Sequence, residues 1–327
     1  MDEFQFIQSI QPSYYRQSTL VKGVSDDAAV FRPTDKDVVT AVDTMVEGIH
    51  FSRKTMDPYH IGYRVLAANL SDLAAMASSP AFYLVSIVIP EGWSEQELKE
   101  LYTGMQDLAS LYQMDLIGGD TVSGSELSIS ITVIGYVEKD RARYRSHAEP
   151  GDVVFATGTL GDSRAGLEIL LNGLSGESAE KFFIERHRTP DPRVFFALEL
   201  EAIPRVALND ISDGVANEAN EIVEASLVDL HLDMDKLPFK SSIKDLFPDT
   251  YKDWILSGGE DFELVGTVEE SLWPKVQQAA KKTGVKVSKI GSVQAMKKKD
   301  PHVYLHEGGK KNVLTKSGYT HLKTKGE

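Results

Sequence analysis

The chain has 327 residues, 42% hydrophobic and 26% charged, which is the composition of an ordinary globular protein long enough for two domains. Its 35 lysines and arginines against 49 aspartates and glutamates give a formal net charge of −14, which argues against a general nucleic-acid binder. The absence of cysteine excludes disulfides, thiolate nucleophiles, zinc–cysteine sites and iron–sulfur clusters. The N-terminus lacks the pattern of a signal peptide, and no apolar run reaches the roughly 18 to 20 residues of a membrane helix. We therefore expect a soluble, cytoplasmic protein that binds neither nucleic acid nor a membrane.

In the first part of the chain, strand-like apolar runs alternate with longer helical patterns. Strands are expected at residues 28–31, 38–42, 82–89, 116–117 and 127–137, and helices at 58–78 and 94–112. Asp57 and Pro58 suit the N-cap and first position of the first helix. Ser94 and Glu97 have the spacing of a capping box at the start of the second.

Residues 138–152 interrupt this pattern with charges, proline and glycine, which predicts a domain boundary. A second α/β series follows, with strands expected at 153–158, 205–208, 262–267 and 287–290 and helices at 164–171, 214–225 and 272–283. The tail from residue 296 indicates a loop and a last hairpin. We predict an N-terminal domain at 1–138, a linker at 139–150 and a C-terminal α/β domain at 151–327.

Several aspartates lie at the edges of these elements, next to small or apolar residues. They are Asp26, Asp27, Asp43, Asp72, Asp120, Asp210 and Asp213. Each alone is explained as readily by a turn or a helix cap. Together they indicate hard-cation chemistry, because Mg²⁺ prefers oxygen ligands and is held by a few carboxylates plus substrate phosphates. Asp72 stands out, because its helical neighbours Val65, Ala68 and Ala75 form a face that should be buried.

Familiar motifs of other enzyme classes are missing. The chain has no Walker A loop, no protein-kinase H-R-D or D-F-G set, no G-x-S-x-G elbow and no H-E-x-x-H pair. The glycine-rich turn at 158–166, GTLGDSRAG, lies between a strand and a helix. It suits an anion at a helix N-terminus, and tight strand–helix packing explains it about equally well.

Eight motifs, taken in order, resemble the bacterial thiamine-monophosphate kinase family. They are GVSDDAAV, VDTMVEGIHF, NLSDLAAM, LIGGDT, RSHAEPGD, TGTLGDSRAGL, DISDG and SGGEDFEL, and the resemblance extends over nearly the whole chain. That family is similar to aminoimidazole ribonucleotide synthetase and selenophosphate synthetase. The resemblance implies a two-domain α/β fold of the α+β type, with helices packed on mixed sheets. It also implies a homodimer whose N-terminal ATP- and Mg-binding domains join their sheets into a barrel.

The implied activity is ATP-dependent phosphorylation of thiamine monophosphate to thiamine diphosphate, by direct in-line transfer with several Mg²⁺ ions. The implied metal ligands are Asp27, Asp43, Asp72, Asp120, Asp210 and Asp213, with Asp27 chosen over Asp26 by the resemblance. The implied nucleotide-binding residues are Gly119, Asp120, Arg145 and Ser212, and those around the thiamine phosphate are His50, Glu260 and Tyr319. Asp72, Asp120 and Arg145 are expected to be catalytic.

This sequence departs from the family pattern at two places. Ala41 and Val42 stand where the family often has serine or threonine, so one metal site loses hydroxyl ligands, and Ser25 stands where glycine is commoner. Neither change removes a carboxylate. The alternatives are another ATP-using synthetase of the same superfamily, or an ATP–Mg-binding module without catalysis.

Overall fold

The computed structural model describes residues 3–24, 28–32, 35–173 and 178–317, which form two compact units. Unit 1 comprises Met1–Ala142 together with a returning segment, Arg188–Leu198. Unit 2 comprises Arg143–His187 and Glu199–Glu327. The chain therefore passes from one unit to the other three times, and the domain boundaries expected from the sequence do not include this return.

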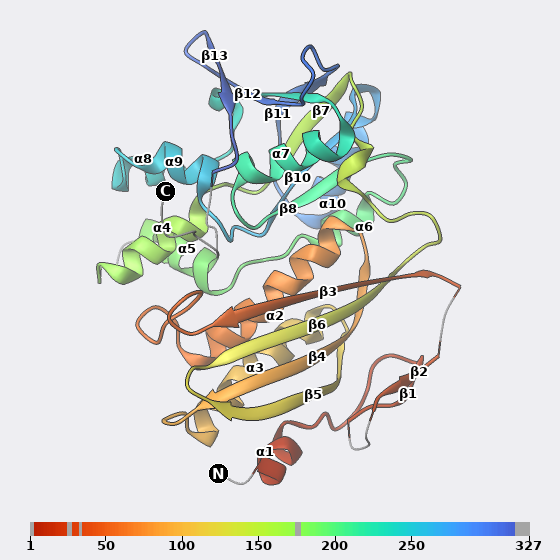
Figure 1. The fold of residues 1–327 in the computed structure, drawn as a ribbon, viewed down its shortest axis with the longest axis vertical. Helices are drawn as coiled ribbons and strands as arrows, with labels where there is room; N and C mark the ends of the chain where they lie inside the picture. Colours follow the sequence, from red (N-terminus) through yellow and green to blue (C-terminus); the bar gives the residue numbers. More distant parts are fainter. Residues whose placement is uncertain (1–2, 25–27, 33–34, 174–177, 318–327) are drawn as a thin grey trace. The chain divides into compact units, whose positions relative to one another are not determined.

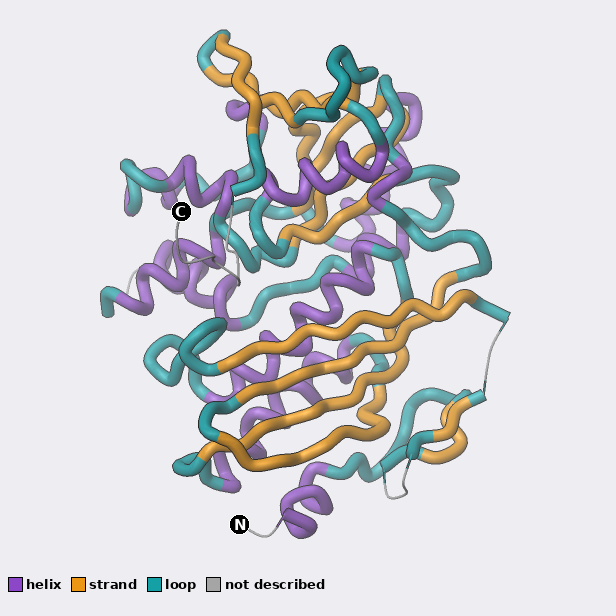
Figure 2. Tube along the Cα trace, viewed as in Figure 1, coloured by secondary structure: helices purple, strands orange, loops and turns teal. Residues whose placement is uncertain are grey.

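Unit 1 is built on a four-stranded sheet with the order β3-β6-β4-β5. Its strands are β3 (Asp37–Val46), β4 (Ser79–Pro90), β5 (Asp115–Gly124) and β6 (Ser128–Val137). Neighbouring strands are antiparallel except β4 and β5, which are parallel. Figures 1 and 2 show α2 (Pro58–Ala75) and α3 (Glu95–Leu111) on one face of this sheet, so its two faces have different environments.

The smaller elements of unit 1 are α1 (Glu3–Ile10), β1 (Leu20–Lys22), β2 (Val30–Phe31) and α6 (Val194–Glu199), whose last residue belongs to unit 2. Leu20 and Phe31 pack against Phe82 of β4, so β1 and β2 cover one end of the sheet. In the returning segment, the Phe195 ring lies 4.9 Å from that of Tyr112, which anchors this segment to the end of α3.

The predicted starts of the two long helices are confirmed. The Asp57 side chain accepts the His60 N–H, and Pro58 occupies the first turn of α2. Ser94 and Glu97 form a reciprocal capping box at the start of α3, which satisfies two backbone N–H groups that have no intrahelical partner. α2 ends at Ala75, slightly earlier than expected, because Ala77 adopts a left-handed backbone (φ 51°) and the chain turns into β4.

Side chains alternate between the two faces of the sheet along β3 and β6. On β6, Ile129, Ile131 and Val133 are fully buried on the helix-covered face. On β3, Val38 and Val42 point to the opposite face and remain 57% and 61% exposed. We call this opposite side the open face of the sheet.

Unit 2 contains a seven-stranded mixed sheet with the order β13-β12-β9-β11-β7-β10-β8. Its strands are β7 (Asp152–Thr157), β8 (Ala207–Ile211), β9 (Asp229–Asp233), β10 (Glu263–Glu269), β11 (Val287–Gln294), β12 (Val303–Glu307) and β13 (Lys310–Leu314). Its α-helices are α4 (Asp162–Leu171), α5 (Ser178–Arg188, whose last residue belongs to unit 1), α7 (Val215–Ser226), α8 (Ser242–Leu246), α9 (Tyr251–Ser257) and α10 (Trp273–Thr283). Within the residues of unit 2 that the structure describes, short 3₁₀ helices lie at Arg145–His147, Met234–Lys236 and Glu270–Leu272.

The core of unit 2 lies between this sheet and α7. Val154 of β7, Val265 of β10 and Ile222 of α7 are completely buried in it. The predicted α/β alternation of this region is thus present, with the expected last hairpin as β12 and β13. In the part of the chain that the structure describes, no helix combines the length and apolar character needed to cross a membrane.

Candidate functional site

A row of residues across the sheet of unit 1 places Asp43 on the helix-covered face. Asp43 of β3 pairs in register with Ile131 of β6, which pairs with Val85 of β4, and Val85 pairs with Gly119 of β5. Residues directly opposite each other share a face, and Ile131 and Val85 are buried. The Asp43 carboxyl is half-buried, and burial raises its pKa, while the nearby His50 acts in the opposite direction.

Helix α2 supports this aspartate. The side chain of Asn69, completely buried, accepts the Asp43 N–H at 3.0 Å and donates to the Val65 carbonyl at 2.9 Å. Asp72 follows Asn69 by three positions, so it lies on the same side of the helix and is half-buried there. Asp72 is therefore not enclosed in an apolar core. The face of α2 that carries it adjoins β3, which carries the carboxylate of Asp43.

His50 belongs to the same side of unit 1. Its Nδ1 accepts the Val46 N–H at 3.0 Å, which closes the turn that follows β3. With Nδ1 an acceptor, any proton on a neutral ring is on Nε2. The structure therefore places Asp43 near His50, and Asp72 on the side of α2 that also carries Asn69, the residue that contacts Asp43.

Asp120 occupies the next row, which lies on the open face. It pairs with Ser86, which pairs with Ser130, and the Ser130 hydroxyl contacts that of Thr44 at 2.7 Å. Asp120 is exposed, and its carboxylate accepts the Thr121 N–H at 3.0 Å. Three strand spacings, about 14 Å, separate β3 from β5 across the sheet. One chain thus presents Asp43 and Asp120 at opposite edges and on opposite faces, too far apart to ligate one ion.

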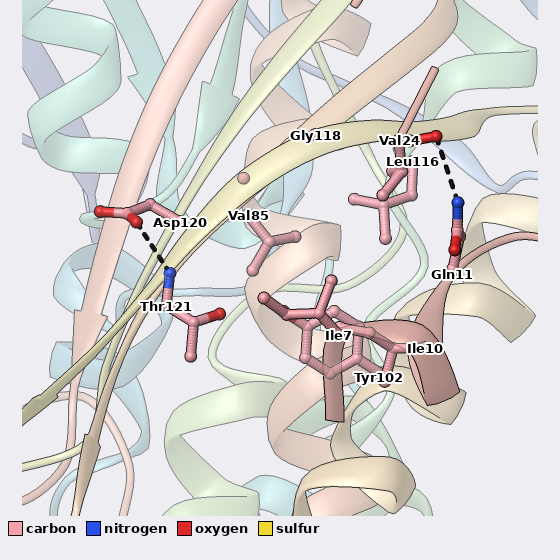
Figure 3. A pocket seen from close by; sticks show the side chains of 11 residues that line it. Ile7, Ile10, Gln11, Val24, Val85, Tyr102, Leu116, Gly118, Asp120 and Thr121 are labelled. Atoms are coloured by element: carbon pink, nitrogen blue, oxygen red, sulfur yellow. Dashed lines mark hydrogen bonds between the residues drawn. The ribbon is translucent and has the colours of Figure 1, made fainter. Parts of the chain in front are cut away.

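A cavity of about 130 Å³ opens beside Gly119 and Asp120 (Figure 3). Apolar side chains from several elements line most of it: Ile7, Ile10, Val24, Val85, Tyr102 and Leu116. Gln11 and the β5 residues Gly118, Gly119, Asp120 and Thr121 complete the lining. A Cβ on Gly119 would come within 2.0 Å of the Val85 carbonyl oxygen, so only glycine fits there. In Figure 3 the Asp120 carboxylate points away from Tyr102 and Ile10. The cavity thus has an apolar interior and a carboxylate at its rim.

Unit 2 holds its predicted ligands next to an unpredicted glutamate. Asp210 is the next-to-last residue of β8 and is 5% exposed, and Ser212 and Asp213 come directly after the strand. Glu218 of α7, 2% exposed, accepts the Asp213 N–H at 3.0 Å and the Ser212 hydroxyl at 3.4 Å. Burial, then Asp210 and Glu221, raise the pKa of Glu218.

Arg145 is connected to the same glutamate through a buried asparagine. Its Nε donates to Asn209 Oδ1 at 2.9 Å, and Asn209 Nδ2 donates to Glu218 Oε2 at 2.8 Å. Arg145 also pairs with Glu221 at 3.2 Å. Three predicted residues, Arg145, Ser212 and Asp213, are therefore joined by one hydrogen-bond network within unit 2.

Sequence analysis missed several residues that these contacts identify. Tyr102 and Asn69 lie in predicted helices among apolar residues, and this pattern predicts a role in the hydrophobic core rather than in a site. For Glu218, the only indication in the sequence was its position five residues after Asp213, at the start of a predicted helix. For Asn209, the only indication was its position directly before Asp210.

Glu260 lies against the Ser212 segment. Its N–H donates to the Ser212 carbonyl at 2.6 Å, and its backbone is left-handed, with φ 64°. Asp27, with Asp26 and Ser25, and Tyr319 lie outside the described residues.

The structure resolves the two interpretations of the glycine-rich turn at 158–166. The carboxylate of Asp261 accepts the Gly161 N–H at 2.6 Å and the Ser163 N–H at 2.9 Å. The N-terminus of α4 is thus satisfied by a side chain of the chain itself, and the turn serves packing.

Metal binding by the protein alone has no support from the geometry. Within the described ranges, no three histidine, aspartate or glutamate side chains gather closely enough to enclose a metal ion. The donors at hand are carboxylate oxygens, as Mg²⁺ prefers, and Mg²⁺ typically takes one or two of them together with waters and substrate phosphates. The residues fit an ion that arrives with a phosphate ligand.

Comparison with known proteins shows the family. Residues 25–137 match the model of the AIR synthase related protein N-terminal domain, and residues 149–303 match that of the C-terminal domain. A thiamine-monophosphate kinase of Bacillus subtilis is 44% identical over 328 residues, covering 99% of this chain and all of that protein. The chain belongs to the thiamine-monophosphate kinase family.

Further relatives agree with this membership. The thiamine-monophosphate kinase of Escherichia coli K12 is 38% identical over 84% of both chains. The crystal structure of the Stenotrophomonas maltophilia family member has a TM-score of 0.83 at 32% identity, covering 93% of this chain and 96% of that one. A structure of AaThiL complexed with AMPPCP and TMP has a TM-score of 0.78 at 28% identity, covering 98% and 97%. The two-domain fold expected from the sequence is confirmed.

Proposed function

We propose that the protein transfers the γ-phosphoryl group of ATP directly to the phosphate of thiamine monophosphate, giving thiamine diphosphate and ADP. Family membership carries this proposal, since a relative of the same fold has been solved with AMPPCP and TMP bound. The acceptor needs no general base, because its phosphate oxygen is already ionised and nucleophilic. Catalysis is then mainly a matter of bringing two anions into line and neutralising their charge.

The cavity of unit 1 suits the nucleotide. Its largely apolar interior, with the Tyr102 ring in the wall, matches a flat heteroaromatic base, and the exposed Asp120 carboxylate at the rim is proposed to lie beside the phosphates. In unit 2, Asn209 holds the Arg145 guanidinium through Nε and Glu221 pairs with Nη2, and the remaining N–H groups are proposed to face a phosphate.

Carboxylates from both units are proposed to hold Mg²⁺, namely Asp27, Asp43, Asp72, Asp120, Asp210 and Asp213. When bound, Mg²⁺ neutralises the charge of the nucleotide and acceptor phosphates. The raised pKa of Asp43 supports this role, because a desolvated carboxylate gains from a cation beside it. His50, Glu260 and Tyr319 are proposed to contact thiamine monophosphate, and the carboxylate of Glu260 matches the positive charge of the thiazolium ring.

The test is a coupled assay of purified protein with ATP, Mg²⁺ and thiamine monophosphate. We expect thiamine diphosphate and ADP in equal amounts, and no product when EDTA exceeds Mg²⁺. ATP binding without formation of thiamine diphosphate would support the non-catalytic module. ADP formation at the same rate with and without thiamine monophosphate would support another synthetase of the superfamily.

We also propose that the working form is a homodimer that joins the open faces of two sheets. Val38, Val42 and Val122 leave apolar surface on strands β3 and β5 that a second copy would cover. Asp43 and Asp120 lie at opposite edges of the sheet of one chain, so we propose that a site using both carboxylates takes one of them from a second chain.

Mixing two inactive variants tests the shared site. If Asp43 and Asp120 come from different chains, subunit exchange between Asp43→Asn and Asp120→Asn proteins restores one intact site in half of the dimers, about a quarter of wild-type activity. If each site is built from one chain, the mixture stays as inactive as its components.

A further inference from the structure

The segment that carries Glu260 has an unusual backbone. Glu260 and Phe262 both have positive φ, 64° and 50°, although neither is a glycine. Such conformations are unfavourable for residues with a Cβ and persist where the surroundings enforce them, commonly at functional sites. The residue between them is Asp261.

Asp261 ties this strained segment to the start of α4. Its side chain is 2% exposed, and its two oxygens accept the N–H groups of Gly161 and Ser163 at 2.6 and 2.9 Å. A carboxylate at a helix N-terminus is further stabilised by the helix dipole. Arg186 adds a second tie, since one of its nitrogens reaches the Asp261 carbonyl at 3.3 Å and Glu263 at 2.6 Å.

These ties determine where Glu260 lies. The Glu260 N–H donates to the Ser212 carbonyl at 2.6 Å, and the Phe262 N–H to the Ile211 carbonyl at 3.0 Å. A Cβ on Gly259 would come within 2.7 Å of that Ser212 oxygen, so the approach is close. Relaxing Asp261 would let the two left-handed residues return to ordinary backbone and move Glu260 away from Ser212 and Asp213.

We propose that Asp261 is a positioning residue for substrate recognition: its anchor on α4 holds Glu260 in the strained conformation that receives the cationic ring of thiamine monophosphate. This rests on the proposed function, in which Glu260 contacts that substrate. Asp261 itself is buried and acts only through Glu260.

The variant Asp261→Asn tests the proposal, because an amide cannot accept two N–H groups through two oxygens. We expect the KM for thiamine monophosphate to rise about tenfold. The KM for ATP should stay within about twofold and kcat within about threefold of wild type. Asp229→Asn is a matched control. Asp229 is a 1% exposed aspartate of unit 2 that also accepts two backbone N–H groups, from Lys297 and His302, and it should lose thermal stability with both KM values unchanged.

A double-mutant cycle with Glu260→Gln identifies the route of the effect. If Asp261 acts through Glu260, adding Asp261→Asn to Glu260→Gln changes the KM for thiamine monophosphate by less than about twofold. Additive effects, or an unchanged KM in folded Asp261→Asn protein, would overturn the proposal. Wild-type protein without thiamine monophosphate turnover would instead refute the proposed function.

A second variant covers the case in which Asp261→Asn does not fold. Arg186→Lys keeps the positive charge beside Glu263 and removes the guanidinium that also reaches the Asp261 carbonyl. We expect the same selective rise of the KM for thiamine monophosphate, smaller in size. A fall of kcat with all KM values unchanged would count against positioning in this variant as well.

Discussion

The sheets of the two units use aspartate in opposite ways. Asp120, in β5 of unit 1, is exposed, and among the described residues its carboxylate accepts the N–H of its neighbour Thr121. Asp152, at the start of β7 in unit 2, is 2% exposed and is surrounded by donors. Arg205 reaches both of its oxygens at 2.6 and 2.8 Å, and Thr267 donates at 3.0 Å.

This difference separates carboxylates that are available to a ligand from those that serve the fold. A carboxylate whose hydrogen-bonding capacity is filled by the protein gains little from a metal ion or phosphate-bound cation. One that faces solvent with spare lone pairs can be recruited by a ligand at small cost to stability. Loss of Asp120 should thus affect turnover, and loss of Asp152 should affect unfolding.

The largest effect is expected for Asp120→Asn. We expect kcat to fall by about 100-fold or more, because charge stabilisation in the transition state is lost. The free energy of unfolding should change by less than about 0.5 kcal/mol, as is usual for an exposed position. Steady-state kinetics measure the change in kcat, and urea unfolding measures the change in stability. Unchanged turnover would remove Asp120 from the site.

Asp152→Ala should show the reverse pattern. Removing one partner of a buried ion pair leaves Arg205 and Thr267 with unmet groups, so we expect a loss of about 3 kcal/mol in the free energy of unfolding. The kcat of the folded protein, measured at a temperature well below the transition, should stay close to wild type. A large fall in kcat with normal stability would break the contrast between the two aspartates.

Asn209→Ala tests whether a buried polar group of unit 2 also serves the site. Arg145 would lose the acceptor that orients its guanidinium, and we expect the KM for ATP to rise about fivefold. Asn220→Ala is a suitable control, because Asn220 is a partly buried asparagine of α7 that donates to the carbonyls of Ala216 and Leu314. If the KM for ATP is the same in the Asn209→Ala and Asn220→Ala variants, Asn209 serves the fold alone.

The smallest effect concerns acid stability in unit 2. Burial, together with Lys311 and His306, lowers the pKa of His231 to about 4. The unfolded chain, with an ordinary histidine pKa of about 6.5, takes up this proton first, so stability is complete above about pH 6.5 and falls toward pH 4. The melting temperature should drop less between pH 7 and pH 5 in His231→Asn than in wild type, and an equal drop would exclude His231 as a cause.

Local signals allowed much of the fold to be predicted. Asp57-Pro58 and the Ser94–Glu97 pair fixed the starts of α2 and α3, because caps depend on a few adjacent residues. Strand β9 was missed because its sequence, DLHLD, alternates two buried leucines with charged and polar residues in a run too short to stand out. The length of β5 was underestimated because its glycines gain strand conformation from pairing with β4, which lies outside local sequence.

The candidate site was predictable as a set of residue types but not as an arrangement. The positions of Asp43 and Asp120 in the sequence do not indicate that they lie on different faces of the sheet. The face of each residue depends on the register of the pairings between β3 and β6, β6 and β4, and β4 and β5. Asn69 and Asn209 could not be recognised, because a buried asparagine acquires its role only from the groups distant in sequence that it contacts.

The returning segment Arg188–Leu198 also sets an order of events during protein synthesis. A nascent chain released from the ribosome only up to residue 142 lacks Phe195, so unit 1 cannot complete its packing on Tyr112 until the first part of unit 2 has been translated. At about 5–20 residues per second, this delay lasts several seconds. During that interval the surface of unit 1 around Tyr112, which Phe195 later covers, is exposed to chaperones and to other nascent copies of the same chain.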